Sequence, residues 1–410
     1  MDLLILNSLF YGLVFFYCLK KKGMKNEMTL IPLVWFLSSI FTILYYNSAL
    51  LYVDVKNDLT IAPFIWLAGL YIMYIIFLWG NNSDTYSRIS IESPQLFNAI
   101  IIAIACCAVP PFIENFIHLI SGGVDWNLML NAKDMQLKIT GTEHLTWVSA
   151  RLQNISGVTL IVVPILLFTY LIRGGKNKLI IAGLIMTILN MFMHNMIIGA
   201  RNIIIQFILY MIYCYMFFKK GLSPKLRKSV NRVAIVFGGL IFLYILYISI
   251  FRFQEDDGAF SGFSALDIFY LYAGEPFYNF NCDIWWTDYY FGGLKSFENL
   301  IAYFDPSFKG MDRFLDIRTW ALYTCFADLF MDFGPFLPYV IVSSILLIAW
   351  CFSRFKKDTS ISSIILVFTI VFYILNGFLY NPYVNLWLHL IAALMIAFLL
   401  SLKQHKVKTQ

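Results

Sequence analysis

The chain has 410 residues, of which 60% are hydrophobic and only 13% are charged. A soluble domain needs a polar surface, so this composition excludes an ordinary globular enzyme and indicates a membrane protein with many spans. The formal net charge of +6 is explained by basic loops that meet anionic lipid headgroups, and it does not indicate nucleic-acid binding.

Apolar runs predict the helices. A helix needs about 20 apolar residues to cross a hydrocarbon core about 30 Å thick. Eleven such runs follow one another, with ten or twelve as the alternatives, because Pro110 and Pro111 interrupt the fourth run and are expected to leave a short span with an amphipathic tail at 114–120. We therefore expect an all-α polytopic membrane protein. The runs centre near Leu13, Leu37, Ile72, Ile104, Ile165, Ile188, Leu209, Leu243, Leu346, Val371 and Ala393.

The lysines and arginines of the loops predict the orientation of these spans. Every second loop is basic, and these loops together hold 20 of the 30 basic residues, whereas the opposite side holds 20 of the 24 acidic residues. Basic loops stay on the cytoplasmic side, so we expect the N-terminus outside and the C-terminus in the cytoplasm. The first run has its lysines after it and lacks a small-residue cleavage site, so we expect a retained span and not a signal peptide.

Two predicted external loops are longer than the rest, and they divide the chain into three regions. Residues 1–251 hold eight spans and the first external loop, at 121–146. Residues 252–334 form a large external loop, in which the runs at 264–271 and 294–304 predict short interfacial helices. Residues 335–410 hold three spans and a cytoplasmic tail. Long loops of this kind usually carry function.

The large loop is rich in aromatic residues. Trp285 and Trp286 are examples, and Glu275 and Asp283 are interleaved with them. Aromatic faces beside carboxylates suit sugar rings, but tryptophan and tyrosine also gather at the headgroup level of membrane proteins, and both interpretations stay open.

The seven cysteines are scattered, and none has the C-x-x-C spacing of a zinc or redox site. Cys282 and Cys325 fall in external loops, where a disulfide is able to persist. The alternative is a pair of free buried thiols.

Isolated polar residues at the outer ends of two apolar runs indicate function. His194 follows Asn190 by four residues and Arg201 follows His194 by seven, so all three share one helical face, while Arg252 ends the eighth run. Two guanidiniums at one depth suit a phosphate or diphosphate, because each bonds phosphate oxygens in pairs and stays charged. The alternative is that each arginine extends to headgroups or pairs with an external carboxylate.

A pair of carboxylates precedes the ninth run. Asp328 and Asp332 are four residues apart, so in a helix both point one way, and one of them is able to have a raised pKa and to act as a base. The alternatives are that they bind a cation or cap the start of the span.

Several of these elements also occur together in a known family. They are Gly199-Ala-Arg201, Ile-Phe-Arg252, Tyr272-Ala-Gly-Glu-Pro276-Phe-Tyr-Asn-Phe, and Tyr323-Thr followed by Leu329-Phe-Met-Asp332-Phe-Gly334. In their order and spacing the chain resembles the O-antigen polymerase family (Wzy, the oligosaccharide repeat-unit polymerases). The resemblance covers the whole chain in topology, and its specific residues lie between about 199 and 334.

The resemblance implies a GT-C-like membrane glycosyltransferase of the bacterial inner (plasma) membrane. Such an enzyme joins undecaprenyl-diphosphate-linked oligosaccharides at the outer face into O-antigen or capsule. Pre-placed arginines would stabilise the charge that builds on the diphosphate. We expect catalytic roles for Arg201, Arg252, His194 and Asp332, with His194, Asp332 and Glu275 as the choices for the general base, and substrate contacts from Arg318, Glu275, Tyr272, Tyr323, Trp285 and Trp286.

Because guanidiniums supply the positive charge, we expect no metal and no other cofactor. The expected partners are the lipid-linked substrates, membrane lipids, a chain-length regulator and a flippase, and no nucleic acid. The alternative functions are a flippase or transporter for lipid-linked glycans, an O-antigen ligase with the same donor chemistry, and a structural membrane subunit.

Overall fold

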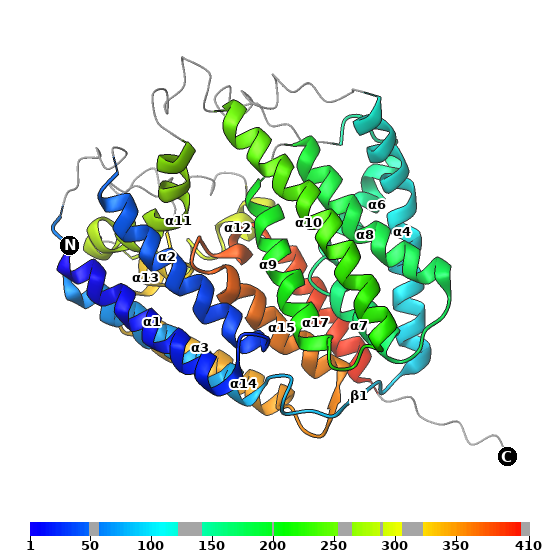
Figure 1. The fold of residues 1–410 in the computed structure, drawn as a ribbon, viewed down its shortest axis with the longest axis horizontal. Coiled ribbons are helices and arrows are strands. Elements are labelled where there is room, and N and C mark those ends of the chain that lie inside the picture. The colour runs from blue at the N-terminus through cyan, green and yellow to red at the C-terminus, as the bar shows by residue number, and fades with distance from the viewer. Residues whose placement is uncertain are drawn as a thin grey trace. The chain divides into compact units, whose positions relative to one another are not determined.

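The computed structural model describes residues 1–48, 57–121, 142–198, 201–252, 265–287, 290–305 and 323–402. These residues are mostly helical, and the sheet within them is one short parallel pair, β1 (Arg88–Ser90) with β2 (Asp358–Ser360). The helices are α1 (Asp2–Lys22), η1 (Glu27–Thr29), α2 (Leu30–Tyr46), α3 (Ile61–Gly80), α4 (Pro94–Ile120), α6 (Trp147–Val158), α7 (Val163–Ile172), α8 (Lys178–Ile197), α9 (Arg201–Phe218), α10 (Pro224–Arg252), α11 (Ala265–Cys282), η2 (Ile284–Trp286), α12 (Glu298–Phe304), α13 (Phe326–Phe333), α14 (Leu337–Ser353), α15 (Ile361–Asn376), α16 (Pro382–Asn385) and α17 (Trp387–Ser401) (Figure 1).

A helix lies at each of the eleven predicted span centres. In the described part of the chain, five helical segments are long and apolar enough to cross a membrane: α1, η1 with α2, α3, α4 and α8. The pair α6 and α7 would make a sixth, and α9, α14, α15 and α17 are apolar but shorter. The all-helical class with several membrane-crossing helices is therefore supported, while the count of eleven stays a prediction.

Prolines have opposite effects in two of the predicted spans. α4 continues through Pro110 and Pro111, so the expected short fourth span is wrong. Each proline removes one backbone donor, but ending the helix there would leave more backbone groups unpaired in an apolar environment. The fifth span, by contrast, is broken, because α6 and α7 meet at 72°. Pro164 in the first turn of α7 has no N–H to continue the ladder of α6, and Gly157 weakens the end of α6.

The chain forms two compact units, and each unit contains segments from all three predicted regions. Unit 1 consists of Met1–Tyr86, Gly262–Lys356 and Val367–Trp387. Unit 2 consists of Ser87–Ser261, Lys357–Leu366 and Leu388–Gln410.

Aromatic side chains form the centre of unit 1. Tyr11 of α1, Trp35 of α2 and Tyr71 of α3 are buried, with ring centroids 4.8–5.6 Å apart, and Phe277 of α11 lies 5.2 Å from Tyr11. The buried indole N–H of Trp35 donates to the Ile374 carbonyl at 2.8 Å. These contacts hold four helices together through large apolar areas.

The Tyr272-Ala-Gly-Glu-Pro276 element is the place where α11 crosses α2. The hydroxyls of Ser38 and Thr42 donate to the carbonyls of Ala273 and Gly274, at 2.6 and 2.8 Å. Gly274 permits this approach, because a Cβ there would lie 2.3 Å from the Phe41 carbonyl oxygen. The motif therefore has a packing role, whatever else it does. The predicted short helices at 264–271 and 294–304 are both present, as α11 and α12, although α11 is longer and α12 starts later.

Gly274→Ala is expected to destabilise the protein, because the added methyl group would overlap a backbone atom that has little room to move. Overpacking of this kind costs about 1–3 kcal/mol. Thermal unfolding of the detergent-purified protein should therefore show a clearly lower melting temperature. Gly80→Ala is the control, since nothing lies within 4 Å of its added Cβ. Equal melting temperatures for the two variants would contradict the packing of α11 on α2.

Candidate functional site

The predicted site residues fall in both units. Unit 2 holds His194, Arg201 and Arg252, and unit 1 holds Tyr272, Glu275, Trp285, Trp286, Tyr323 and Asp332. Arg318 and Gly199 lie outside the described residues.

The two arginines occupy the ends of consecutive helices in unit 2. Arg201 is the first residue of α9, and Arg252 is the last residue of α10. A short connection at 219–223 joins the two helices, which run in opposite directions, so both arginines lie at the same end of the pair (Figure 1). α10 has 29 residues and α9 has 18. The two arginines can therefore lie at the same depth in a membrane only if the exposed, basic first turns of α10 extend beyond the end of α9.

A network of amides lies on the His194 face of α8. Asn190 is buried and donates to Gln153 Oε1 of α6 at 2.6 Å, while Asn115 of α4 donates to Asn190 Oδ1 at 2.7 Å. His144 Nε2 lies 2.7 Å from Asn115 Oδ1. Asn190 therefore lies inside unit 2, but the prediction that Arg201 shares its helical face is wrong, because α8 ends at Ile197 and Arg201 begins α9. Burial lowers the pKa of His144, and the nearby charges of His118 and His194 lower it further. Because the amides satisfy one another, the network mainly fixes α4, α6 and α8 together.

Asp332 of α13 holds a loop in unit 1. Its two carboxylate oxygens accept the backbone N–H groups of Lys295 and Ser296, at 2.8 and 2.7 Å, and its carbonyl accepts the Gly292 N–H at 2.8 Å. Both oxygens of the buried carboxylate are therefore engaged by backbone donors. This arrangement favours a positioning role for Asp332 over the predicted role as general base.

Asp328, one helical turn earlier, lacks the backbone donors that Asp332 has. It is fully buried, and neither of its oxygens accepts a hydrogen bond of normal geometry from a described residue. Burial raises the pKa of Asp328 from 3.8 to about 7. The charge of Lys295 and the hydroxyl of Tyr323 oppose this rise in pKa, the charge of Asp332 adds to it, and the Asn381 amide opposes it. A carboxyl with a pKa near neutrality is able both to accept and to release a proton.

Lys295 supplies the positive charge beside these acids. It is only 5% exposed, and its ammonium lies 3.2 Å from Glu298 Oε2. The sequence interpretation missed this residue, although it is one of only two lysines in the sequence of the acidic external loop at 252–334. We call Lys295, Glu298, Tyr323, Asp328, Asp332 and Asn381 the Asp328 cluster.

The aromatic residues of the large loop have different surroundings. Trp285 stacks on Phe330 of α13 with ring centroids 4.8 Å apart, so it belongs to the packing of unit 1. Trp286 is 44% exposed and donates its indole N–H to the Asn281 carbonyl at 3.0 Å, so its outer face is free to stack on a ligand. Tyr272 is half-buried and Glu275 is buried on α11.

Cys282 and Cys325 are both buried, and no disulfide joins them, so the structure favours the second of the two predicted alternatives.

No protein-family model, no curated protein and no solved structure matches the chain.

Asp328→Asn is expected to remove a pH dependence of stability. The folded pKa near 7 lies above the ordinary value of 3.8, so the proton bound to Asp328 stabilises the folded state fully below about pH 4, and this contribution is lost as the pH rises through 7. Between pH 5.5 and pH 8, the wild-type melting temperature should fall relative to that of the variant. The exposed Asp358→Asn is the control. Parallel curves for wild type and Asp328→Asn would contradict the prediction.

Asp332→Asn is expected to loosen the segment at 291–298, because the amide offers one acceptor oxygen where the carboxylate offers two to backbone donors. A lost hydrogen bond to a charged group costs about 1.5–3 kcal/mol. Hydrogen exchange followed by mass spectrometry should show faster exchange of peptides that contain Lys295 and Ser296. Glu298→Gln is the control, because Glu298 contacts the Lys295 side chain. Unchanged hydrogen exchange of these peptides in Asp332→Asn would contradict the positioning role of Asp332.

Proposed function

We propose that this chain is a membrane glycosyltransferase of the bacterial plasma membrane, which polymerises undecaprenyl-diphosphate-linked oligosaccharide repeat units at the outer face. The observation that carries the proposal is the pair of arginines at the same end of α9 and α10, away from the basic connection between them. Isolated, permanently charged guanidiniums in apolar helices suit a lipid diphosphate.

In the proposed reaction, a hydroxyl of the incoming lipid-linked repeat unit attacks the anomeric carbon of the growing chain. A new glycosidic C–O bond forms, and the glycosyl–phosphate bond breaks with its electron pair going to the diphosphate. Arg201 and Arg252 stabilise the negative charge that develops there. The proton of the attacking hydroxyl passes to a general base.

Within unit 1, Asp328 is better suited to accept a proton than Asp332. The oxygens of Asp332 are engaged by two backbone donors, whereas those of Asp328 accept no hydrogen bond of normal geometry from the described residues. Lys295 lies close enough to favour the ionised carboxylate, which is the form that accepts a proton. Asp328 is fully covered in this structure.

The proposal is tested by the length of the glycans that cells make. In a strain that lacks this gene, complementation with wild type should restore a ladder of long glycans. Arg201→Ala and Arg252→Ala should each lower polymer yield by about a hundredfold or more, the typical effect of losing one group that stabilises the transition state. Gel analysis at matched membrane levels of protein gives the measurement, and Arg173→Ala, an exposed arginine after α7, is the control.

The outcomes separate the alternatives. Single repeat units on lipid A core in the null strain support a polymerase. Failure of single units to reach the outer face supports a flippase, and normal polymer that stays unattached supports a ligase. Full ladders from both arginine variants would overturn the assignment of the diphosphate site.

A further inference from the structure

An apolar groove runs between α1 and α3 in unit 1. Its volume is about 530 Å³, and its walls include Phe10, Val14 and Tyr17 of α1 and Ile72, Ile76 and Trp79 of α3. Residues at its rim are open to the surroundings: Leu13 is 71% exposed, Ile76 is 68% exposed and Tyr17 is 56% exposed. Both helices are long and apolar enough to cross a membrane. In a bilayer, the groove therefore opens toward acyl chains.

Basic residues follow directly at one end of the groove. α1 ends with Lys20, Lys21 and Lys22. Lys21 follows Tyr17 by four residues and Val14 by seven, and Lys20 follows Tyr17 by three and Leu13 by seven. At helical spacing, Lys20 and Lys21 thus continue the face of α1 that lines the groove.

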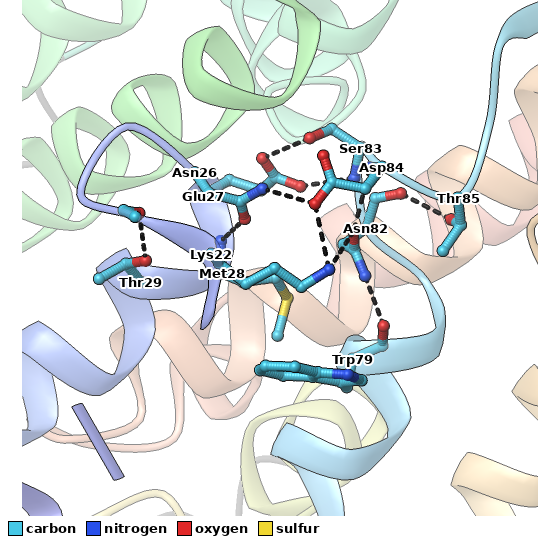
Figure 2. A network of polar contacts seen from close by, with 11 residues as sticks. Lys22, Asn26, Glu27, Met28, Thr29, Trp79, Asn82, Ser83, Asp84 and Thr85 are labelled. Carbon is cyan, nitrogen blue, oxygen red and sulfur yellow. Dashed lines mark hydrogen bonds and ion pairs between the residues drawn. The ribbon is translucent and has the colours of Figure 1, made fainter. Parts of the chain in front are cut away.

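The three lysines differ in their contacts. The Lys22 ammonium lies 3.1 Å from Asp84 Oδ2 and 3.3 Å from Asn82 Oδ1, and 5.0 Å from the centre of the Trp79 ring (Figure 2). Lys20 and Lys21 are exposed, and neither makes a hydrogen bond or an ion pair within the described part of the chain. Lys22 is therefore held beside Trp79 at the end of the groove, while the ammonium groups of Lys20 and Lys21 stay available for a ligand.

The neighbouring acids are already engaged. Asp84 accepts from Lys22 and from Asn26 Nδ2, the latter at 3.1 Å. Glu27 is buried and accepts from the backbone N–H and the hydroxyl of Ser83, at 2.6 and 2.8 Å (Figure 2). Neither of these two carboxylates therefore pairs with Lys20 or Lys21.

We propose that the groove binds one anionic phospholipid, with an acyl chain along the apolar walls and the phosphate at Lys20 and Lys21. Tyr17 and Trp79 lie 5.7 Å apart where the apolar walls meet the lysines, the position that amphipathic aromatic rings take at a membrane interface. A zwitterionic lipid would fill the same walls, but it would gain less from the two ammonium groups. The inference depends on the membrane-crossing helices and is independent of the proposed glycosyl transfer.

Native mass spectrometry of the delipidated full-length protein tests the proposal. Titration with dioleoylphosphatidylglycerol and with dioleoylphosphatidylcholine should show one tight site that prefers the anionic lipid by about tenfold or more, as two lysines near a headgroup predict. The double variant Lys20→Gln with Lys21→Gln should lose the preference. The double variant Lys225→Gln with Lys228→Gln, which removes the same charge from exposed positions of α10, should keep it.

A second variant tests the apolar part. Val14→Trp fills the groove and leaves both lysines in place, so it should weaken the binding of both lipids, with size-exclusion chromatography as the check on folding. Equal binding of the two lipids by wild type, or a preference that survives in Lys20→Gln with Lys21→Gln, would overturn the proposal. Displacement of the lipid by an equal concentration of inorganic phosphate would show that the lysines bind free phosphate, and it would overturn the lipid as occupant.

Discussion

Polar groups that enter the apolar interior of this chain need partners from the chain itself, and this requirement shapes both its helices and its loops. α4 stays helical through Pro110 and Pro111, because the helix loses only two donors there. At the crossing of α2 and α11, hydroxyls of α2 bond to carbonyls of α11 beside Pro276. In a bilayer such a demand cannot be met by water.

Asp328 is an exception to this requirement for partners, as a comparison with Asp332 shows. Asp332 lies one turn away on the same eight-residue helix and has a backbone donor for each oxygen. Asp328 is equally buried, yet it has a lysine nearby and no hydrogen bond of normal geometry to a described residue. Burial disfavours the charged form and raises the pKa of Asp328 to about 7, although Lys295, Tyr323 and Asn381 oppose this rise. This property is costly for stability and is suited to proton transfer.

The helices could be predicted because apolar runs are a local property of the sequence. All eleven predicted centres fall in helices. The errors occur at prolines, where the cost of a lost backbone hydrogen bond competes with the cost of ending a helix in an apolar environment. Pro110 and Pro111 do not end α4, whereas α6 ends before Pro164, after Gly157 and a turn. The four-residue spacing of Asp328 and Asp332 predicted one raised pKa, but the choice between them depends on the fold of a loop some 35 residues earlier. Lys295 was missed for the same reason, because its burial beside Asp328 depends on that loop.

α3 connects the apolar groove of unit 1 with the two buried carboxylates of α13. One face of α3 forms a wall of this groove. The ring centroids of Trp66 in α3 and Phe330 in α13 are 5.4 Å apart, and in the sequence Phe330 stands between Asp328 and Asp332. Trp66 also donates its indole N–H to the Pro335 carbonyl at 2.6 Å. Polar contacts fix both ends of α3: Thr60 exchanges two hydrogen bonds with Asn281, and Asn81 accepts the Phe355 N–H at 2.9 Å. A helix held at both ends transmits displacement better than a free one, because packed interiors deform little. Filling the groove beside α3 would therefore act on the same rigid element against which α13 and its two carboxylates are packed.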